Sequence, residues 1–478
     1  MMRKKGSVTV FLTLILSLLL SLICASIESV RMASARTQIL NGMDIGLYSL
    51  FGQYDKELLT DYDLFALDGS RGGGQLNLAA VCDELEAYMN PVLKQNSQKL
   101  TLCQSGLTGY RLLTDQNGEA FYQQIVGYMQ ETLGSQGIQL LLGRMSERQE
   151  KTAQADQSAN QAQSKGSIDR YDSEMNQASE KSQQAAEEAQ VVPQAPPAKN
   201  PITIMKRIMK RGVLELVLPG GNGLSTKEIE KGTLVSGRGL QQGLEMPDGM
   251  TTENGYTSEV LFQQCLMEHL GSYAEPSSAG LAYQMEYVFG GKNSDEDNLK
   301  AVASKLLFIR EGVNFACLMA DNVKRSEAQA LATAIASGFL VPPAAVIIEA
   351  ALILCWAFAE SVLDVRELFA GGRIPLVKSS GDWQISLGNL PDLMEGLDSM
   401  RRNDEKGMSY KDYLQVLVLT VSKEKKVMRA MDMIENTIRE KGRKNFCMDS
   451  CIVALEAFAD VKANKKKDFQ VIRQYCYE

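Results

Sequence analysis

The sequence predicts a mainly helical protein with minor β structure, an α+β class in which a membrane helix precedes a small unit, a polar linker and a larger helical domain. Three observations carry this prediction. The stretch from Gly6 to Ile27 contains no charged residue, which is typical of a membrane-spanning helix. Residues 148–201 are polar and contain several prolines. In the C-terminal half, apolar residues recur at steps of three and four, as on one face of a helix.

The N-terminal helix is the clearest single feature. Ser7 to Ile27 as a helix spans roughly 31 Å, which matches a hydrocarbon core of about 30 Å. Arg3, Lys4 and Lys5 precede it, and the positive-inside tendency keeps such residues in the cytoplasm. We therefore expect a single-pass protein of the cell membrane, with the residues after Glu28 extracytoplasmic. A cleaved secretory signal is the alternative, because a basic start and an apolar stretch also describe one.

The composition excludes several classes of protein. A chain of 478 residues with 45% hydrophobic and 23% charged residues has the make-up of two or three globular units. Its net charge of -8 would repel phosphate groups, so no nucleic-acid partner is expected. A single histidine, His269, removes multi-histidine metal sites. No cofactor and no metal are predicted.

Nine cysteines are scattered through the chain without a CxxC pair. Cys447 and Cys451 are four residues apart, and on a helix they would be close enough to share a metal ion or a disulfide partner. Without nearby histidines or a second cysteine pair, we interpret them as free thiols in a core.

Changes in composition along the chain predict how it is divided into domains. The expected divisions are 1–43 for the basic N-terminus and the helix with its extension, 44–147 for a small α+β unit, 148–201 for the linker, and 202–478 for a mainly helical domain. Leu100–Cys103 and Tyr110–Leu113 resemble short strands in the small unit. The stretch from Arg148 to Gln190 has few large apolar residues and is expected to be a linker or a solvated helix.

Two helices of the large domain are predicted from apolar stripes. The first stripe consists of Leu299, Val302, Leu306, Ile309 and Val313, and the second of Val427, Met431, Ile434 and Ile438. Val213–Leu218 and Trp383–Leu387 are candidate short strands.

The segment 330–359 admits two interpretations. It is apolar enough for a second membrane span, but Pro342 and Pro343 divide it into halves that are each too short to cross a bilayer. A buried helical hairpin is the favoured interpretation.

Candidate chemistry is sparse. Glu349, Glu360 and Glu367 are 11 and 7 residues apart and fall on one face of a helix. Such a row of carboxylates can bind a cation or act as acid and base. Glutamates of this kind more often pair with Lys or Arg of neighbouring helices. No catalytic residue is predicted.

The favoured functional surface is a face of the membrane helix. Thr9, Thr13, Ser17 and Ser21 lie along one stripe of small polar residues, and helices in lipid associate through close contacts of this kind. We expect a partner helix from a pilin-like or assembly-platform protein. The alternative is that single spans simply tolerate serine and threonine.

The N-terminus resembles that of type IV pilin-like proteins, particularly the minor pseudopilins of Tad-type pili. The residues that carry this resemblance are Lys5-Gly6-Ser7-Val8-Thr9-Val10-Phe11 and the apolar run after them. The resemblance implies cleavage by a prepilin peptidase between Gly6 and Ser7. Phe11 departs from the family pattern, which has a glutamate at that place.

Beyond the N-terminus, most of the chain except its middle is similar to a domain-of-unknown-function family of Gram-positive bacteria that is often associated with Tad-type pili. The matching segments are 54–59, 61–65, 283–292, 298–311 and 356–366. This resemblance implies a non-enzymatic, membrane-anchored accessory component of a Tad-like or type IV-like pilus or secretion apparatus. An anchored envelope hydrolase that uses carboxylates, or a surface adhesin or sensor, are the alternatives.

Overall fold

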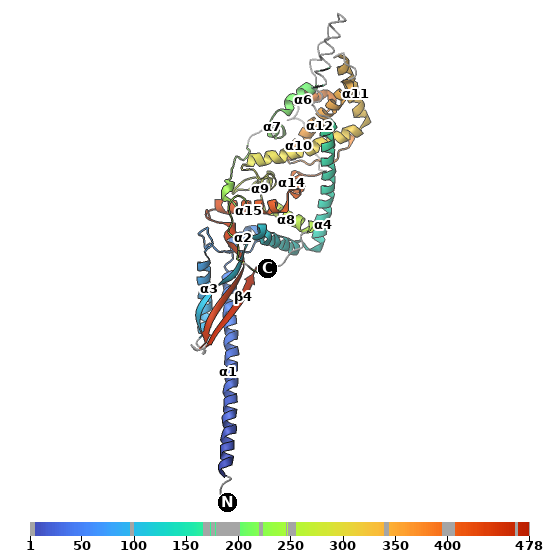
Figure 1. Ribbon diagram of the computed structural model, residues 1–478. Coiled ribbons are helices and arrows are strands. Elements are labelled where there is room, and N and C mark those ends of the chain that lie inside the picture. Colours follow the sequence, from blue (N-terminus) through green and yellow to red (C-terminus); the bar gives the residue numbers. More distant parts are fainter. Residues whose placement is uncertain are drawn as a thin grey trace. The chain divides into compact units, whose positions relative to one another are not determined.

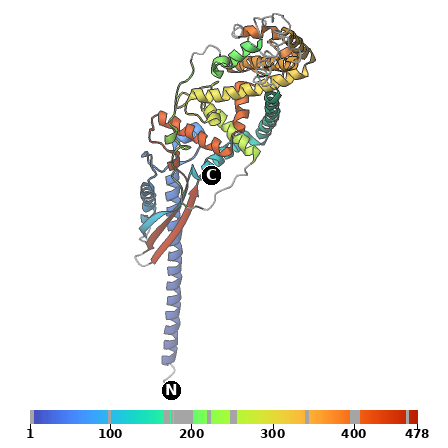
Figure 2. The same cartoon turned by 45° about the horizontal axis from the view of Figure 1, so that its top comes forward.

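The computed structural model describes most of the chain (Figures 1 and 2). The described residues are 5–95, 100–165, 173, 177, 201–218, 223–244, 246, 255–338, 344–393, 407–463 and 467–477. The first of two compact units contains residues 1–128, 237–253 and 438–478, and the second contains residues 129–236 and 254–437. Helices dominate and one small antiparallel sheet is present, which confirms the predicted α+β class.

The first unit is built on α1 (Lys5–Phe51), a helix of 47 residues without a proline. From Val8 to Ile27 its large apolar side chains are exposed, as illustrated by Phe11 at 63%. Farther along, one face becomes buried through Ala35, Ile39, Met43, Leu47 and Leu50. The predicted long apolar N-terminal helix is therefore confirmed. By length and composition it is suited to be a membrane anchor or a signal sequence.

The sheet of the first unit has β3 (Cys451–Ala463) at its centre. β3 pairs antiparallel with β2 (Leu100–Leu112) and with β4 (Lys467–Cys476). The short β1 (Leu67–Asp68) pairs with the first residues of β3. The two short strands expected near 100 and 110 are thus one irregular strand. Gly106 leaves room within it for the Phe458 ring of β3, because a Cβ at this position would lie 2.6 Å from that ring.

The C-terminal strands are a correction to the expected domain division. The sequence analysis assigned residues 202–478 to a mainly helical domain, but residues 438–478 belong to the first unit, in which β3 and β4 form most of the sheet. Alanine and glutamate in 454–459 favour helix. Pairing with β2, more than 300 residues earlier in the chain, overrides that local preference.

The remaining helices of the first unit cover the sheet and α1. α2 (Lys56–Tyr62) begins at Asp55, whose carboxylate accepts from the amides of Glu57 and Leu58. α3 (Leu78–Lys94) buries one face against α1. In both views, α3 and the strands lie beside the C-terminal half of α1, and the N-terminal half extends past them (Figures 1 and 2).

The second unit consists of helices joined by irregular segments and short 3₁₀ turns. The helices are α4 (Asp115–Lys165), which begins in the first unit, α6 (Pro201–Met209), α7 (Val213–Val217), α8 (Tyr256–His269), α9 (Gln284–Gly290), α10 (Asp295–Ala320), α11 (Asn322–Gly338), α12 (Ala345–Phe369), α14 (Tyr410–Leu419) and α15 (Lys423–Glu440). The 3₁₀ turns are 231–233, 380–382 and 387–392 here and 448–450 in the first unit. Both predicted apolar stripes, on α10 and α15, are buried, so these two helices are confirmed.

Three other expectations need correction. Residues 213–217 form α7 instead of a strand. Residues 383–386 lie between two 3₁₀ turns, and the second of these turns begins at Leu387. Residues 148–165, expected to be linker or solvated helix, continue α4 and bury small side chains such as Ala159. Gly312 of α10 permits this close approach, because a Cβ there would lie 2.3 Å from Ala159. Most of 166–200, with its prolines, lies outside the described residues.

The ambiguous segment 330–359 contributes to α11 and α12, which pack against each other. α12 is long and apolar enough to cross a membrane, yet 78% of its most apolar window is buried within the protein. This burial supports the interpretation as a buried hairpin.

We expect Ile39→Ala in α1 to destabilise the first unit by about 2–4 kcal/mol, because Ile39 is fully buried against the sheet core. Thr37→Ala is the matched control, since Thr37 is exposed on the same helix. Hydrogen exchange of the β3 amides measures the effect. Equal exchange in the two variants would contradict the packing of α1 on the sheet.

Candidate functional site

The stripe of small residues on α1 is exposed along the apolar half of the helix. Three of its hydroxyls donate to carbonyls of their own helix: Thr13 to Val10 at 2.9 Å, Ser17 to Leu14 at 2.9 Å and Ser21 to Leu18 at 2.8 Å. These bonds satisfy the hydroxyl protons without a partner. Thr9 begins the same stripe. The stripe therefore offers a narrow contact surface that carries no unsatisfied donor at these three positions.

The possible processing site, Gly6 and Ser7, lies at the start of α1. The side chains of these two residues lie outside the described part of the chain. Phe11 is exposed together with the neighbouring apolar residues.

The three glutamates of the carboxylate row lie on α12 in different surroundings. Glu349 is partly buried and pairs with Arg325 of α11 at 3.2 Å. Glu360 is fully buried. Glu367 lies near the end of α12, close to Gly372. Among the residues that the structure describes, no group of His, Cys, Asp or Glu is arranged to hold a metal ion.

Glu360 belongs to a buried network of charges that the sequence analysis did not anticipate. Its carboxylate lies 2.6 Å from the ammonium of Lys378 and accepts from the backbone amides of Gln384 and Ile385. Lys378 also contacts Asp364 at 2.5 Å, and Asp364 pairs with Arg310 of α10 at 2.8 Å. Two carboxylates and two cations thus alternate along an open chain, in the order Glu360, Lys378, Asp364 and Arg310.

Neutral groups complete this network. The Arg310 guanidinium donates to the carbonyls of Pro375 and Leu376, and the Asn314 amide donates to Asp364 at 3.0 Å. Burial opposes ionisation of Asp364, but Lys378 and Arg310 outweigh it and lower its pKa. The network therefore links α10, α12 and the segment 374–385 as a structural core.

Another buried acid, Glu286 of α9, has fewer hydrogen-bond partners than Glu360. One oxygen accepts from the Tyr273 amide at 2.8 Å and from the Tyr410 hydroxyl at 2.7 Å. The other oxygen has no hydrogen-bond partner among the described residues. Burial raises the pKa of Glu286 to about 7. Glutamate within the apolar run 285–289 was the available sequence signal, and it was missed.

Asp432 is a further buried acid of the second unit. It accepts from the Ser236 amide at 2.8 Å, the Ser236 hydroxyl at 2.6 Å and the Tyr287 hydroxyl at 2.7 Å. Burial raises its pKa despite these bonds. Because Tyr287 neighbours Glu286 in α9, the segment 283–292 is held from two sides by buried hydrogen bonds.

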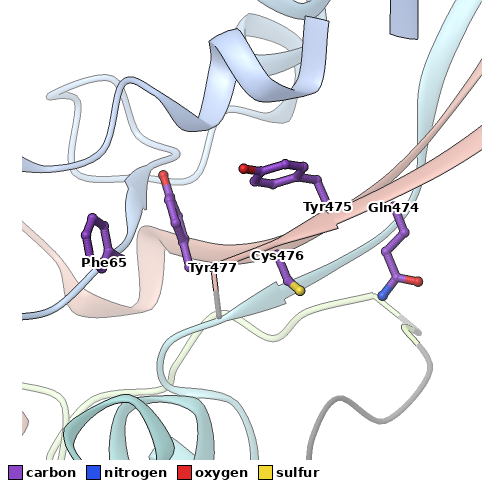
Figure 3. A pocket seen from close by; sticks show the side chains of 5 residues that line it. All are labelled: Phe65, Gln474, Tyr475, Cys476 and Tyr477. Carbon is purple, nitrogen blue, oxygen red and sulfur yellow. The ribbon is translucent and has the colours of Figure 1, made fainter. Parts of the chain in front are cut away.

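A shallow pocket lies in the first unit at the end of β4 (Figure 3). It is lined by Phe65, Gln474, Tyr475, Cys476 and Tyr477. The rings of Phe65 and Tyr477 stack at 5.7 Å, and the Tyr477 hydroxyl donates to the Phe51 carbonyl at 2.7 Å. These aromatic contacts fasten the C-terminal residues to α1. The lining carries no charged side chain that would select a ligand.

The cysteine pair is not arranged as on a helix. Cys447 precedes a 3₁₀ turn and Cys451 begins β3. The Cys451 thiol lies 3.7 Å from the Cys447 carbonyl oxygen, and the Arg439 guanidinium lies 3.3 Å from the Cys447 sulfur. The structure describes all nine cysteines, and no disulfide joins any two of them.

Comparison with known proteins identifies a family without a known activity. Residues 193–463 match the model of a family of unknown function, DUF5702, and this range covers more than half of the chain. No curated protein and no solved structure matches. The match provides no link to Tad-type pili or to pilins.

Two glutamates of α12 provide a matched pair for testing the buried network. We expect Glu360→Gln to destabilise the second unit by about 3 kcal/mol, because it leaves Lys378 buried with less negative charge. Glu349→Gln should cost less than about 1 kcal/mol, since its pair with Arg325 is near the surface. Denaturant unfolding followed by the fluorescence of Trp356 and Trp383 measures both. Similar losses would contradict the distinction.

Glu286 makes the stability of the second unit depend on pH. The unfolded chain ionises this carboxyl near pH 4.5 and the folded protein near pH 7. The stabilisation is therefore complete below about pH 4.5 and is lost as the pH rises through about 7.

We expect Glu286→Gln to reduce this downward slope by up to about 1.4 kcal/mol per pH unit. Glu311, whose pKa burial also raises to about 7, keeps its own contribution in this variant. Tryptophan-detected unfolding across that range measures the slope. A variant with the wild-type slope would refute the assignment.

Proposed function

This chain belongs to the family of unknown function DUF5702, and we propose that it is a non-enzymatic, membrane-anchored accessory component of a Tad-like or type IV-like pilus or secretion apparatus. The anchored part of this proposal rests on α1, and the pilus part rests on the resemblance of residues 5–11 to pilin-like N-termini. In this proposal α1 crosses the cell membrane once with its N-terminus in the cytoplasm. Both units then lie outside the membrane, where they contribute to assembly or attachment.

The observation that carries the proposal is the change of surroundings along α1. Large apolar side chains from Val8 to Ile27 are exposed, whereas from Ala35 to Phe51 one face of the helix is packed in the first unit. Leaving the first group in water would cost free energy in proportion to its area. Lipid or a neighbouring apolar helix removes that cost. One continuous helix then fixes the first unit to the membrane.

The small-residue stripe supports a partner within the membrane. Its hydroxyl protons are already bonded within α1 at Thr13, Ser17 and Ser21, so a second helix can approach closely without stranding a donor. The resemblance of residues 5–11 to pilin-like N-termini favours a pilin-like or assembly-platform protein as that partner.

The buried acids support a non-enzymatic role. Glu360 and Asp364 form ion pairs with Lys378 and Arg310, and each of the four side chains is at most 3% exposed. Glu349 is paired with Arg325. These carboxylates hold helices together and are not presented to a substrate, which disfavours the envelope hydrolase that uses them.

We expect the combined change Thr13→Leu, Ser17→Leu and Ser21→Leu to lower recovery of pilin-like or assembly-platform proteins about tenfold, because it fills the contact stripe. Quantitative mass spectrometry after purification in mild detergent measures this recovery. Ile15→Ala with Leu22→Ala, on the opposite face, is the control and should leave recovery unchanged.

Two outcomes would overturn the proposal. Unchanged recovery with the leucine variant would remove the stripe as a partner surface. An intact mass that lacks residues 7–27 in the mature protein would identify the segment as a cleaved signal and remove the anchor.

A further inference from the structure

The first residue of β4 lies beside α1 at the point where the charge-free segment of the helix stops. Lys467, the first residue of β4, approaches Glu28 at 3.5 Å and Met32 at 2.6 Å. Glu28 is the first charged residue after the segment Gly6–Ile27. The ammonium of Lys467 is therefore level with the end of the apolar part of α1.

The direction of β4 fixes this arrangement along the helix. Arg473 pairs with Asp44 at 2.9 Å, and the Tyr475 ring packs on Phe51 at 4.8 Å. Contacts thus advance together along β4 and α1, so the two elements run parallel. Figures 1 and 2 show that β4 begins near the middle of α1, beside the start of the uncovered N-terminal half of the helix.

Cations gather at this end of the first unit. The exposed cations are Arg31, Arg36, Lys94, Lys462 and Lys467. The carboxylates near them are Glu28, Asp468 and the half-buried Asp460 of β3. Residues 464–466, which the structure does not describe, are left out of this count. Asp468 lies 3.8 Å from Lys462, and cations remain in excess.

We infer that Arg31, Lys462 and Lys467 form a basic collar that binds the headgroups of anionic phospholipids. This inference rests on the proposed anchoring of α1 in a membrane. If the hydrocarbon ends near Ile27, one helical turn brings the chain into the headgroup layer, where Glu28 and Lys467 lie. Cations in that layer are attracted by anionic lipids and add to anchoring.

Lysines of the first unit that lie farther from the lipid than the collar should be affected less by lipid charge. Val92 accepts from Gln38, so the end of α3, with Lys94, lies roughly 16 Å beyond Ile27 along the helix. That exceeds the Debye length of about 8 Å at physiological salt. Lys56 and Lys444 are exposed lysines at the other end of the unit, near Phe51 and α2, and serve as internal references.

Lysine footprinting of the full chain in lipid nanodiscs tests the inference. One set of discs contains only zwitterionic phosphatidylcholine, and the other contains about a third anionic phosphatidylglycerol. We expect acetylation of Lys462 and Lys467 to slow about fivefold in the anionic discs. Lys94 should slow less, and Lys56 and Lys444 should not change. High salt should remove the difference.

A charge variant gives a second readout. In Lys462→Gln with Lys467→Gln, protection of the β3–β4 amides from hydrogen exchange should no longer depend on anionic lipid. The control Lys56→Gln with Lys444→Gln removes the same charge and should retain the dependence.

The outcomes separate the inference from the anchoring on which it rests. Retention in the discs with equal footprints in both lipid mixtures overturns the collar and leaves the anchor intact. Recovery of the protein outside the discs overturns the anchor and the collar with it.

Discussion

The first unit depends on α1 meeting two different surroundings with one unbroken helix. Its buried face, from Ala35 to Phe51, supplies the surface on which α3 and the sheet pack. Its exposed apolar half cannot be covered by that unit, because the packed elements accompany only the C-terminal half (Figure 1). A rigid helix transmits position along its length, so whatever holds residues 8–27 also fixes the height and orientation of the sheet. The same constraint brings the β3–β4 end of the sheet to the level of Glu28.

The second unit is organised differently, around charges that are buried and mutually satisfied. Arg310, Asp364, Lys378 and Glu360 form an alternating chain whose members come from α10, α12 and the segment after α12. Removing any one member leaves an opposite charge in a medium of low dielectric, which costs more than the intact pair contributes. Such a network specifies one packing of these helices more strongly than it stabilises them. Glu286 has no counter-ion in this network, and one of its oxygens has no hydrogen-bond partner among the described residues. Burial instead raises the pKa of Glu286, which favours the uncharged carboxyl group.

Local patterns were sufficient to predict some elements and failed for others for identifiable reasons. The charge-free N-terminal run and the stripes on α10 and α15 are periodic over several turns, so α1 and both helices could be predicted. β3 could not, because its pairing partners β2 and β4 override a helix-favouring composition. The burial of 148–165 depends on contact between Ala159 and Gly312, which a scale based on large apolar residues misses. Glu360 was found, but its partner Lys378 lies in an irregular segment without a periodic signal.

The range matched by the family model contains residues of both units. It runs from residue 193 to 463 and therefore ends with β3, the central strand of the first unit. The strand β2, the helix α1 and the strand β4 lie outside the range, although each packs on β3 or pairs with it. Alone, the matched range would expose the hydrogen-bonding edges and the buried face of β3. In this chain, the range thus requires the N-terminal helix and its strand in order to complete its own fold, which ties the family segment to α1 through one sheet.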